Sequence, residues 1–146
     1  MTKRTNKDKT LLRVAEGFRV GILAGRPSKG FCFAICLPLH SYIRGYLGEP
    51  RAQLIERHFY RLNQYDGDET TNHFWIELED GRILDPTADQ FERASGRYPS
   101  VYLGPLPNEY RAWMEAGELR LKAKALATKP AEREAFVRKS GYRPSS

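Results

Sequence analysis

The chain has 146 residues, 40% of them hydrophobic, and a formal net charge of +6. This length suffices for one hydrophobic core but not for two ordinary domains. No apolar run approaches the roughly 18 residues needed to cross a membrane, and the polar first residues lead into no signal-like segment. We therefore expect a single α+β domain that has no membrane partner and works in the cytoplasm.

The positive charge is concentrated at the two ends of the chain. Residues 1–13 contain five basic groups and one acidic group, and residues 117–146 contain eight basic and three acidic groups. Such arms can contact nucleic acid or an acidic protein partner, although a solvated terminus has the same composition. We expect residues 1–10 to form a disordered basic arm, residues 11–116 the single folded domain, and residues 117–146 a helical basic extension and tail.

Neither a metal nor a nucleotide is expected. Cys32 and Cys36 are the two cysteines, and in a cytosolic chain they are expected to be free thiols. Their spacing to His40 and His58 matches no familiar zinc pattern. The glycine-rich residues 25–30 resemble a phosphate loop, but an aromatic residue and a cysteine follow where a lysine and a serine or threonine would be required. No cofactor is therefore predicted.

The first half of the chain is predicted to be mostly helical. Residues 11–23 predict a short helix or strand, since the glycines in this region argue against a long helix. Residues 31–47 predict a buried helix. Pro38 would either kink this helix or start a new one after a first turn that carries Cys32. Residues 51–62 also have a helical spacing of apolar positions.

Two strands of a hairpin are predicted after a loop at residues 63–69. In the first strand, which carries His73, polar and apolar residues alternate, as is typical of a half-buried strand. A two-residue turn would point Asp85 away from His73, whereas a three-residue turn with Gly81 in the left-handed region would pair Asp85 opposite Trp75 and on the same face as His73. We favour the second register. The alternative is an exposed histidine beside an aspartate that only closes a turn.

The last part of the chain is predicted to contain short elements and then helices. Residues 88–99 predict a loop with one helical turn, and residues 101–103 a short strand. Asn108 is a predicted N-cap for a helix that ends near Ala116. Residues 119–139 predict two further helices or a frayed extension.

Cys32, His73 and Asp85 together suggest nucleophilic catalysis. The unpaired N–H groups at the start of a helix favour the thiolate form of a cysteine there, and an imidazole beside it completes an ion pair. An aspartate on the other ring nitrogen fixes the tautomer of the imidazole. Cys36 would be the nucleophile instead if the helix began at Pro38; we favour Cys32.

A family resemblance rests on three segments: Gly30-Phe31-Cys32, His73-Phe74-Trp75-Ile76-Glu77 and Asp85-Pro86-Thr87. They resemble the Cys-His-Asp core of the transglutaminase-like branch of papain-fold enzymes, and Asp89-Gln90-Phe91 extends the similarity to small phage and bacterial proteins of this type. The resemblance implies a papain-like α+β fold in which a nucleophile helix packs on a small antiparallel sheet.

The resemblance also implies a role for each site residue. Cys32 would be the nucleophile, His73 the general base and acid, and Asp85 the residue that orients the imidazole. Apart from the resemblance, Trp75 would either form a wall of the substrate cleft or simply pack in the core. The backbone N–H of Cys32 would be one donor to the oxyanion, and the second donor has no candidate.

The function expected from these residues is acyl transfer or hydrolysis at an amide or ester carbonyl of a protein or peptide. Water as the acceptor would make the protein a peptidase or deamidase, and an amine would make it a transglutaminase. The alternative is a catalytically inactive module of the same fold that binds nucleic acid or an acidic protein through its basic termini.

Overall fold

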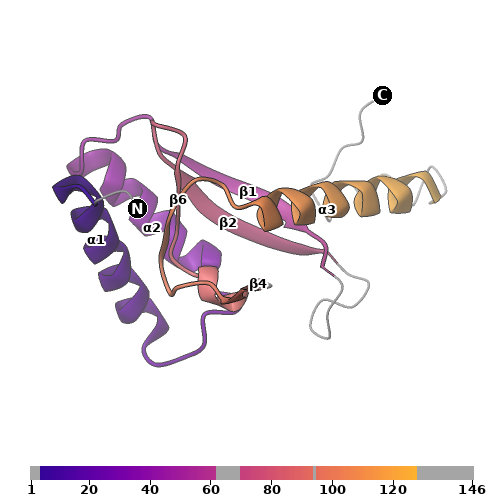
Figure 1. The fold of residues 1–146 in the computed structure, drawn as a ribbon, viewed down its shortest axis with the longest axis horizontal. Helices are drawn as coiled ribbons and strands as arrows, with labels where there is room; N and C mark the ends of the chain where they lie inside the picture. The colour runs from indigo at the N-terminus through magenta and orange to yellow at the C-terminus, as the bar shows by residue number, and fades with distance from the viewer. Residues whose placement is uncertain (1–3, 62–69, 94, 128–146) are drawn as a thin grey trace. The chain divides into compact units, whose positions relative to one another are not determined.

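The computed structural model describes residues 4–61, 70–93 and 95–127. Over these ranges the chain is a mixed α+β protein with three α-helices and a small antiparallel four-stranded sheet of order β1-β2-β3-β6 (Figure 1). The helices are α1 (Asn6–Leu23), α2 (Cys32–Tyr46) and α3 (Asn108–Ala127). The sheet contains β1 (Gln53–Phe59), β2 (Thr71–Glu77), β3 (Ile83–Asp85) and β6 (Tyr102–Gly104). Between β3 and β6 lie the 3-10 turn η1 (Ala88–Gln90) and a ribbon of β4 (Glu92–Arg93) and β5 (Gly96–Arg97).

The chain divides into two compact units. The first contains the described residues of Met1–Glu56 and His73–Pro107, and the second those of Arg57–Asn72 and Asn108–Ser146. This division differs from the single domain predicted over residues 11–116. No helix in the described ranges is long and apolar enough to cross a membrane.

Helix α1 overturns the prediction of a disordered arm for residues 6–10, because it begins at Asn6, while residues 1–3 lie outside the described residues. The Thr5 hydroxyl caps the helix by accepting a hydrogen bond from the backbone N–H of Asp8 at 3.1 Å. The prediction of only a short element after residue 10 is also wrong. The internal glycines lie on the exposed side of α1, and burial of Leu11 and Ala15 outweighs the helix propensity that they cost.

Helix α2 is continuous and contains Pro38, so no new helix starts at the proline. Its first residue is Cys32, as predicted for the start of the helix. Ile35, Leu39 and Ile43 are fully buried along one face, on both sides of the proline. Packing of this face keeps the helix intact although the proline removes one backbone hydrogen bond.

Strand β1 replaces the helix predicted over residues 51–62. A short apolar run fits a helical and an extended period equally well, so the sequence pattern alone did not decide between them. Pairing with β2 in the sheet decides for the strand. The loop predicted at residues 63–69 lies outside the described residues.

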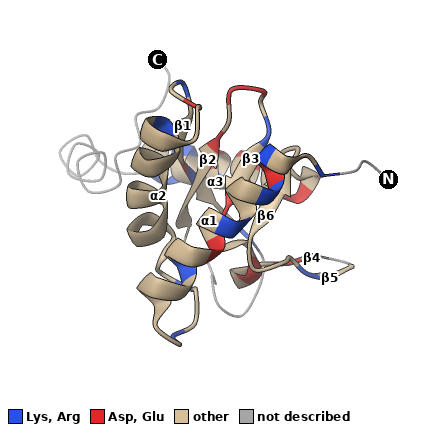
Figure 2. Cartoon of the chain, turned by 90° about the vertical axis from the view of Figure 1, so that its left-hand side faces the viewer, with Lys and Arg blue, Asp and Glu red and all other residues tan. Residues whose placement is uncertain are grey.

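The core of the first unit lies between the helix pair α1 and α2 and one face of the sheet (Figure 2). Ile76 of β2 and Leu78 just after it lie on this face. The neighbouring strands β3 and β6 add Leu84 and Leu103 to it. The buried members of the cluster are Leu11, Ala15, Leu39, Ile43, Ala52, Ile76, Leu78, Leu84, Val101 and Leu103. The strand β2 is not half-buried, however, because His73 and Trp75 on its other face are also buried.

The later elements match the predictions in kind and differ in length. The turn η1 and the strand β6 agree with the single turn and the short strand predicted there. Helix α3 begins at Asn108 but runs to Ala127, well beyond the predicted end at Ala116. The rest of the extension predicted to follow it, residues 128–146, lies outside the described residues.

Replacing Gly117 with alanine should destabilise the protein, although alanine is the better helix former. A Cβ atom at this position would clash with the backbone carbonyl of His58. We expect a loss of about 1–3 kcal/mol in the free energy of unfolding, measured by urea denaturation. Gly21→Ala in α1 is the matched control: its Cβ meets nothing within 4 Å, so this variant should be more stable than wild type. Equal stability of both variants would contradict the close approach at Gly117.

Candidate active site

The hairpin of β2 and β3 has the register that the sequence favoured. Ile76 pairs with Leu84, and a three-residue loop closes the hairpin with Gly81 at a φ of 89°. The loop length matters because side chains alternate between the faces of a strand. This register brings Asp85 onto the face of β2 that carries His73, so the prediction is confirmed.

His73 and Asp85 form a buried pair. His73 Nε2 lies 2.6 Å from Asp85 Oδ2, and both residues are 0% exposed. The other carboxylate oxygen accepts hydrogen bonds from the backbone N–H of Thr87 at 2.9 Å and from its hydroxyl at 3.4 Å. The alternative of an exposed histidine is therefore wrong. The turn in that alternative is present, however, because the carboxylate of Asp85 accepts a hydrogen bond from the backbone N–H of Thr87.

The surroundings of His73 favour its charged form. Burial lowers the pKa of His73, but the charge of Asp85 and the hydrogen bond to Asp85 raise it, as do a hydrogen bond with Cys32 and the charge of that residue. The net result is a pKa of about 9, compared with the ordinary value of 6.5. The direction of this change favours the imidazolium form of the ring.

Cys32 is the thiol that hydrogen-bonds with His73. It is the first residue of α2 and is 7% exposed. Because Asp85 holds Nε2 of the ring, we assign the hydrogen bond with Cys32 to Nδ1.

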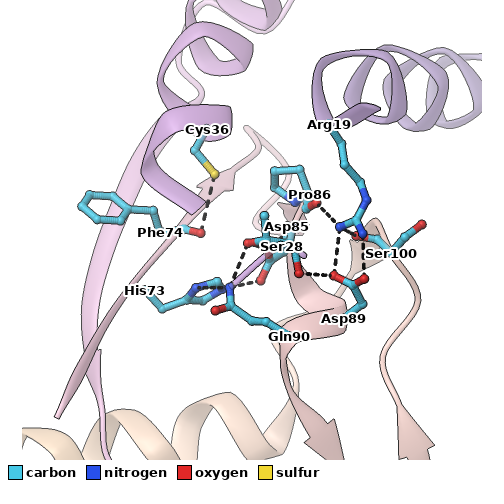
Figure 3. A network of polar contacts seen from close by, with 11 residues as sticks. Arg19, Ser28, Cys36, His73, Phe74, Asp85, Pro86, Asp89, Gln90 and Ser100 are labelled. Atoms are coloured by element: carbon cyan, nitrogen blue, oxygen red, sulfur yellow. Dashed lines mark hydrogen bonds and ion pairs between the residues drawn. The ribbon is translucent and has the colours of Figure 1, made fainter. Parts of the chain in front are cut away.

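Cys36 lies one turn further along α2 and has different surroundings. It is fully buried, and its thiol donates to the carbonyl oxygen of Phe74 at 3.5 Å (Figure 3). Burial, followed by the charges of Asp85 and Cys32, raises the pKa of Cys36 well above its ordinary value. Of the two thiols, Cys32 is therefore the one that hydrogen-bonds with the imidazole and the less buried one.

Two aromatic side chains hold the imidazole ring of His73. Phe91 contacts it edge-on at 4.6 Å between ring centroids, and Trp75 lies at 5.6 Å. Trp75 is only 2% exposed, so its main contact in this structure is packing beside the imidazole. Its role as a wall of the substrate cleft stays a prediction.

Gln90 and Thr87 also lie in the site, and neither was predicted from the sequence to have a role there. Gln90 Nε2 donates to the Thr87 hydroxyl at 3.0 Å and lies 3.4 Å from Nδ1 of His73. The signal in the sequence was their spacing: residues three apart face the same side of a single 3-10 turn. That turn is recognisable only once its position next to the histidine is known.

An ion pair fixes the segment that carries these residues (Figure 3). Both terminal nitrogens of Arg19 contact the carboxylate of Asp89, at 2.9 and 2.7 Å, and Arg19 also donates to the carbonyl oxygens of Pro86 and Ser100. Ser28, in the loop that precedes α2, donates to the same carboxylate at 2.7 Å. One carboxylate thus connects α1, the loop before α2 and the turn η1.

Within the described residues, no group of three or more His, Cys, Asp or Glu side chains is placed to hold a metal ion. Comparisons of the chain with models of protein families, with curated proteins and with solved structures find no match. What the site can do is therefore inferred from its own geometry and chemistry.

Proposed function

We propose that this protein is a cysteine-dependent enzyme that transfers or hydrolyses acyl groups at an amide or ester carbonyl, with a papain-like, transglutaminase-like arrangement of Cys32, His73 and Asp85. The observation that carries this proposal is the bridging position of the His73 ring. One ring nitrogen contacts a buried carboxylate at 2.6 Å, and the ring hydrogen-bonds with the thiol at the start of α2. A thiol, an imidazole and a carboxylate in this order form a nucleophile, a base and an orienting group.

The proposed reaction starts from the Cys32 thiolate beside the His73 imidazolium. The sulfur forms a bond to the carbonyl carbon, and the π electron pair moves onto the oxygen. When the carbonyl re-forms, the bond to the leaving group breaks, and the leaving group takes the proton from Nδ1 of His73. This step leaves a thioester and a neutral imidazole.

Release of the acyl group reverses these roles. Water or an amine attacks the thioester and gives its proton to Nδ1, and Cys32 leaves as the thiolate. The site then has its starting charges again. Water would give hydrolysis of a peptide or deamidation of a side chain, and an amine would give transamidation. A protein or peptide amide is the proposed substrate.

The alternative of a binding module gains no specific support from the described residues. Two basic groups of the N-terminal arm are used inside the fold: Arg4 donates to the carbonyl oxygen of Leu103 at 3.1 Å, and Lys7 pairs with Glu49. Binding of nucleic acid or an acidic partner by the termini stays a prediction.

Labelling with iodoacetamide tests the proposed nucleophile. Cys32→Ala should abolish rapid alkylation at neutral pH, whereas Cys36→Ala, the matched control, should be alkylated at the wild-type rate. His73→Ala should slow the reaction of Cys32 by about tenfold or more, because the thiolate loses its partner. The modified residue and the rate are read by mass spectrometry of the intact protein and its peptides. Rapid labelling that persists in Cys32→Ala would refute the proposal.

A further inference from the structure

We propose that the carboxamide of Gln90 is the second donor that holds the oxyanion when Cys32 attacks a carbonyl. This inference rests on the proposed function and adds a catalytic residue to it. The first donor would be the backbone N–H of Cys32 at the start of α2. No residue upstream of Cys32 had suggested a second donor, and Gln90 reaches the site from downstream of Asp85 instead.

A closed ring of contacts places the Gln90 side chain. His73 Nε2 contacts Asp85 at 2.6 Å, Asp85 accepts from the Thr87 hydroxyl at 3.4 Å, and that hydroxyl accepts from Gln90 Nε2 at 3.0 Å. The ring closes where Gln90 Nε2 lies 3.4 Å from Nδ1 of His73 (Figure 3). The turn η1 thus directs Gln90 at the one imidazole nitrogen that Asp85 does not hold.

The ring also fixes which end of the Gln90 amide faces the histidine. The Thr87 hydroxyl gives its proton to the Asp85 carboxylate, so its oxygen is available as an acceptor. Gln90 must then present its NH₂ group to Thr87, which leaves the second N–H on the side of Nδ1. A donor, and not the amide carbonyl, therefore faces the reacting pair.

The thiol and this donor both contact the His73 ring. Cys32 hydrogen-bonds with His73, by our assignment at Nδ1, and Gln90 Nε2 lies 3.4 Å from Nδ1. The second N–H of Gln90 can donate to Nδ1 only while that nitrogen carries no proton. When Nδ1 is protonated, this N–H needs another acceptor, and we propose that the oxygen of an acyl group on Cys32 is that acceptor.

The donor is held in place before any substrate arrives. Asp89, the residue before Gln90, is tied to Arg19 at 2.7 Å and to Ser28 at 2.7 Å. These bonds fix the backbone of η1 against the loop that leads to Cys32. Stabilisation of an oxyanion is strongest when the donors need no reorganisation during the reaction. Gln90 itself is half-buried, whereas His73 and Asp85 are fully buried, so its side chain has room to contact a substrate.

Two reactions of the same thiol separate this role from a structural one. Alkylation by iodoacetamide displaces iodide at a saturated carbon and forms no oxyanion, whereas acylation by p-nitrophenyl acetate passes through a tetrahedral oxyanion. We expect Gln90→Met, which keeps the volume but has no donor, to lower the acylation rate by about tenfold to a thousandfold. The alkylation rate should stay within about threefold of wild type, because Cys32, His73 and Asp85 are unchanged.

Gln90→Glu provides a second variant with the same shape as the native side chain. Its carboxylate cannot donate and repels the oxyanion, so acylation should fall further than in Gln90→Met, again with little change in alkylation. Gln53→Ala, at an exposed position on β1, is the matched control and should react like wild type with both reagents. Circular dichroism checks that each variant is folded.

The results distinguish three cases. Unchanged acylation in both Gln90 variants would overturn the inference. A parallel fall of acylation and alkylation would also overturn it, because Gln90 would then act by positioning the ion pair. If wild-type protein reacts with neither reagent faster than Cys32→Ala, the proposed function itself is wrong. The selective loss of acylation is the result that supports Gln90 as the donor.

Discussion

Replacing Asp85 with alanine should lower the free energy of unfolding by about 3–5 kcal/mol, because it removes one partner of a fully buried charged pair. The substitution leaves Nε2 of His73 without the carboxylate at 2.6 Å and leaves the Thr87 backbone N–H without its acceptor. Neither group reaches water, since His73 and Thr87 are both 0% exposed. Urea denaturation followed by circular dichroism measures the loss.

The same substitution should suppress the chemistry of the site. Burial lowers the pKa of His73, and without Asp85 only Cys32 would oppose that effect. The imidazolium would then no longer persist at neutral pH, and the thiolate would lose its counter-ion. We expect alkylation of Cys32 at pH 7 to slow by about 10²–10⁴-fold.

Asp85→Asn is the matched variant that separates the two effects. Its amide oxygen can still accept from the imidazole and from Thr87, so its stability should lie closer to that of wild type. It has no charge, and its reactivity should fall nearly as far as that of the alanine variant. A wild-type urea midpoint for Asp85→Ala would show that the buried pair does not stabilise the fold.

The buried His73 should make the stability of the protein decrease as the pH rises from about 6.5 to about 9. The folded protein holds a proton on His73 up to a pKa of about 9, and the unfolded chain releases it near the ordinary value of 6.5. Between these values the folded state binds more protons at His73, so the stabilisation from this residue is complete below pH 6.5 and is lost as the pH passes through 9. A Cys32 thiolate in the folded state binds one proton fewer than a thiol and offsets this change, so the decrease is expected in Cys32→Ser, which has no thiol at this position. The contribution of His73 is on the order of 3 kcal/mol.

Urea midpoints of Cys32→Ser measured at intervals from pH 6 to pH 9.5 test this prediction. Adding His73→Gln removes the titrating group and should flatten the dependence across that window. The raised pKa of Cys36 contributes only at more alkaline pH, because a thiol has an ordinary value of 9.0. Adding Cys36→Ala to Cys32→Ser should therefore keep the decline between pH 6.5 and 9. A flat profile in Cys32→Ser would contradict the raised pKa of His73.

Several features of the site were predictable because they depend on neighbours in the sequence. Cys32 begins α2 as expected, since the glycine-containing segment before it ends in a turn. His73 and Asp85 lie on the same face because the turn between their strands has three residues. Gly81 allows this turn by adopting the left-handed conformation. Local geometry within a hairpin determines this relation without help from the rest of the fold.

The errors fall where distant contacts decide the local structure. Residues 51–62 have apolar spacing that suits a helix, but β1 pairs with β2 in the sheet. The glycines of α1 weaken a helix in isolation, yet packing of Leu11 and Ala15 against the core sustains eighteen residues of it. In both cases tertiary contacts outweigh a local preference of about 1 kcal/mol per residue.

The sequence by itself singled out the imidazole, the carboxylate and two candidate thiols, and it favoured the hairpin register that puts the first two together. Only the tertiary structure decided which thiol faces the imidazole, how deeply the pair is buried, and that Gln90 and the Arg19–Asp89 pair complete the site. The physical reason is separation along the chain. Cys32 and His73 lie on different elements, and Arg19 and Asp89 are 70 residues apart, so their contacts depend on how α1, α2 and the sheet pack.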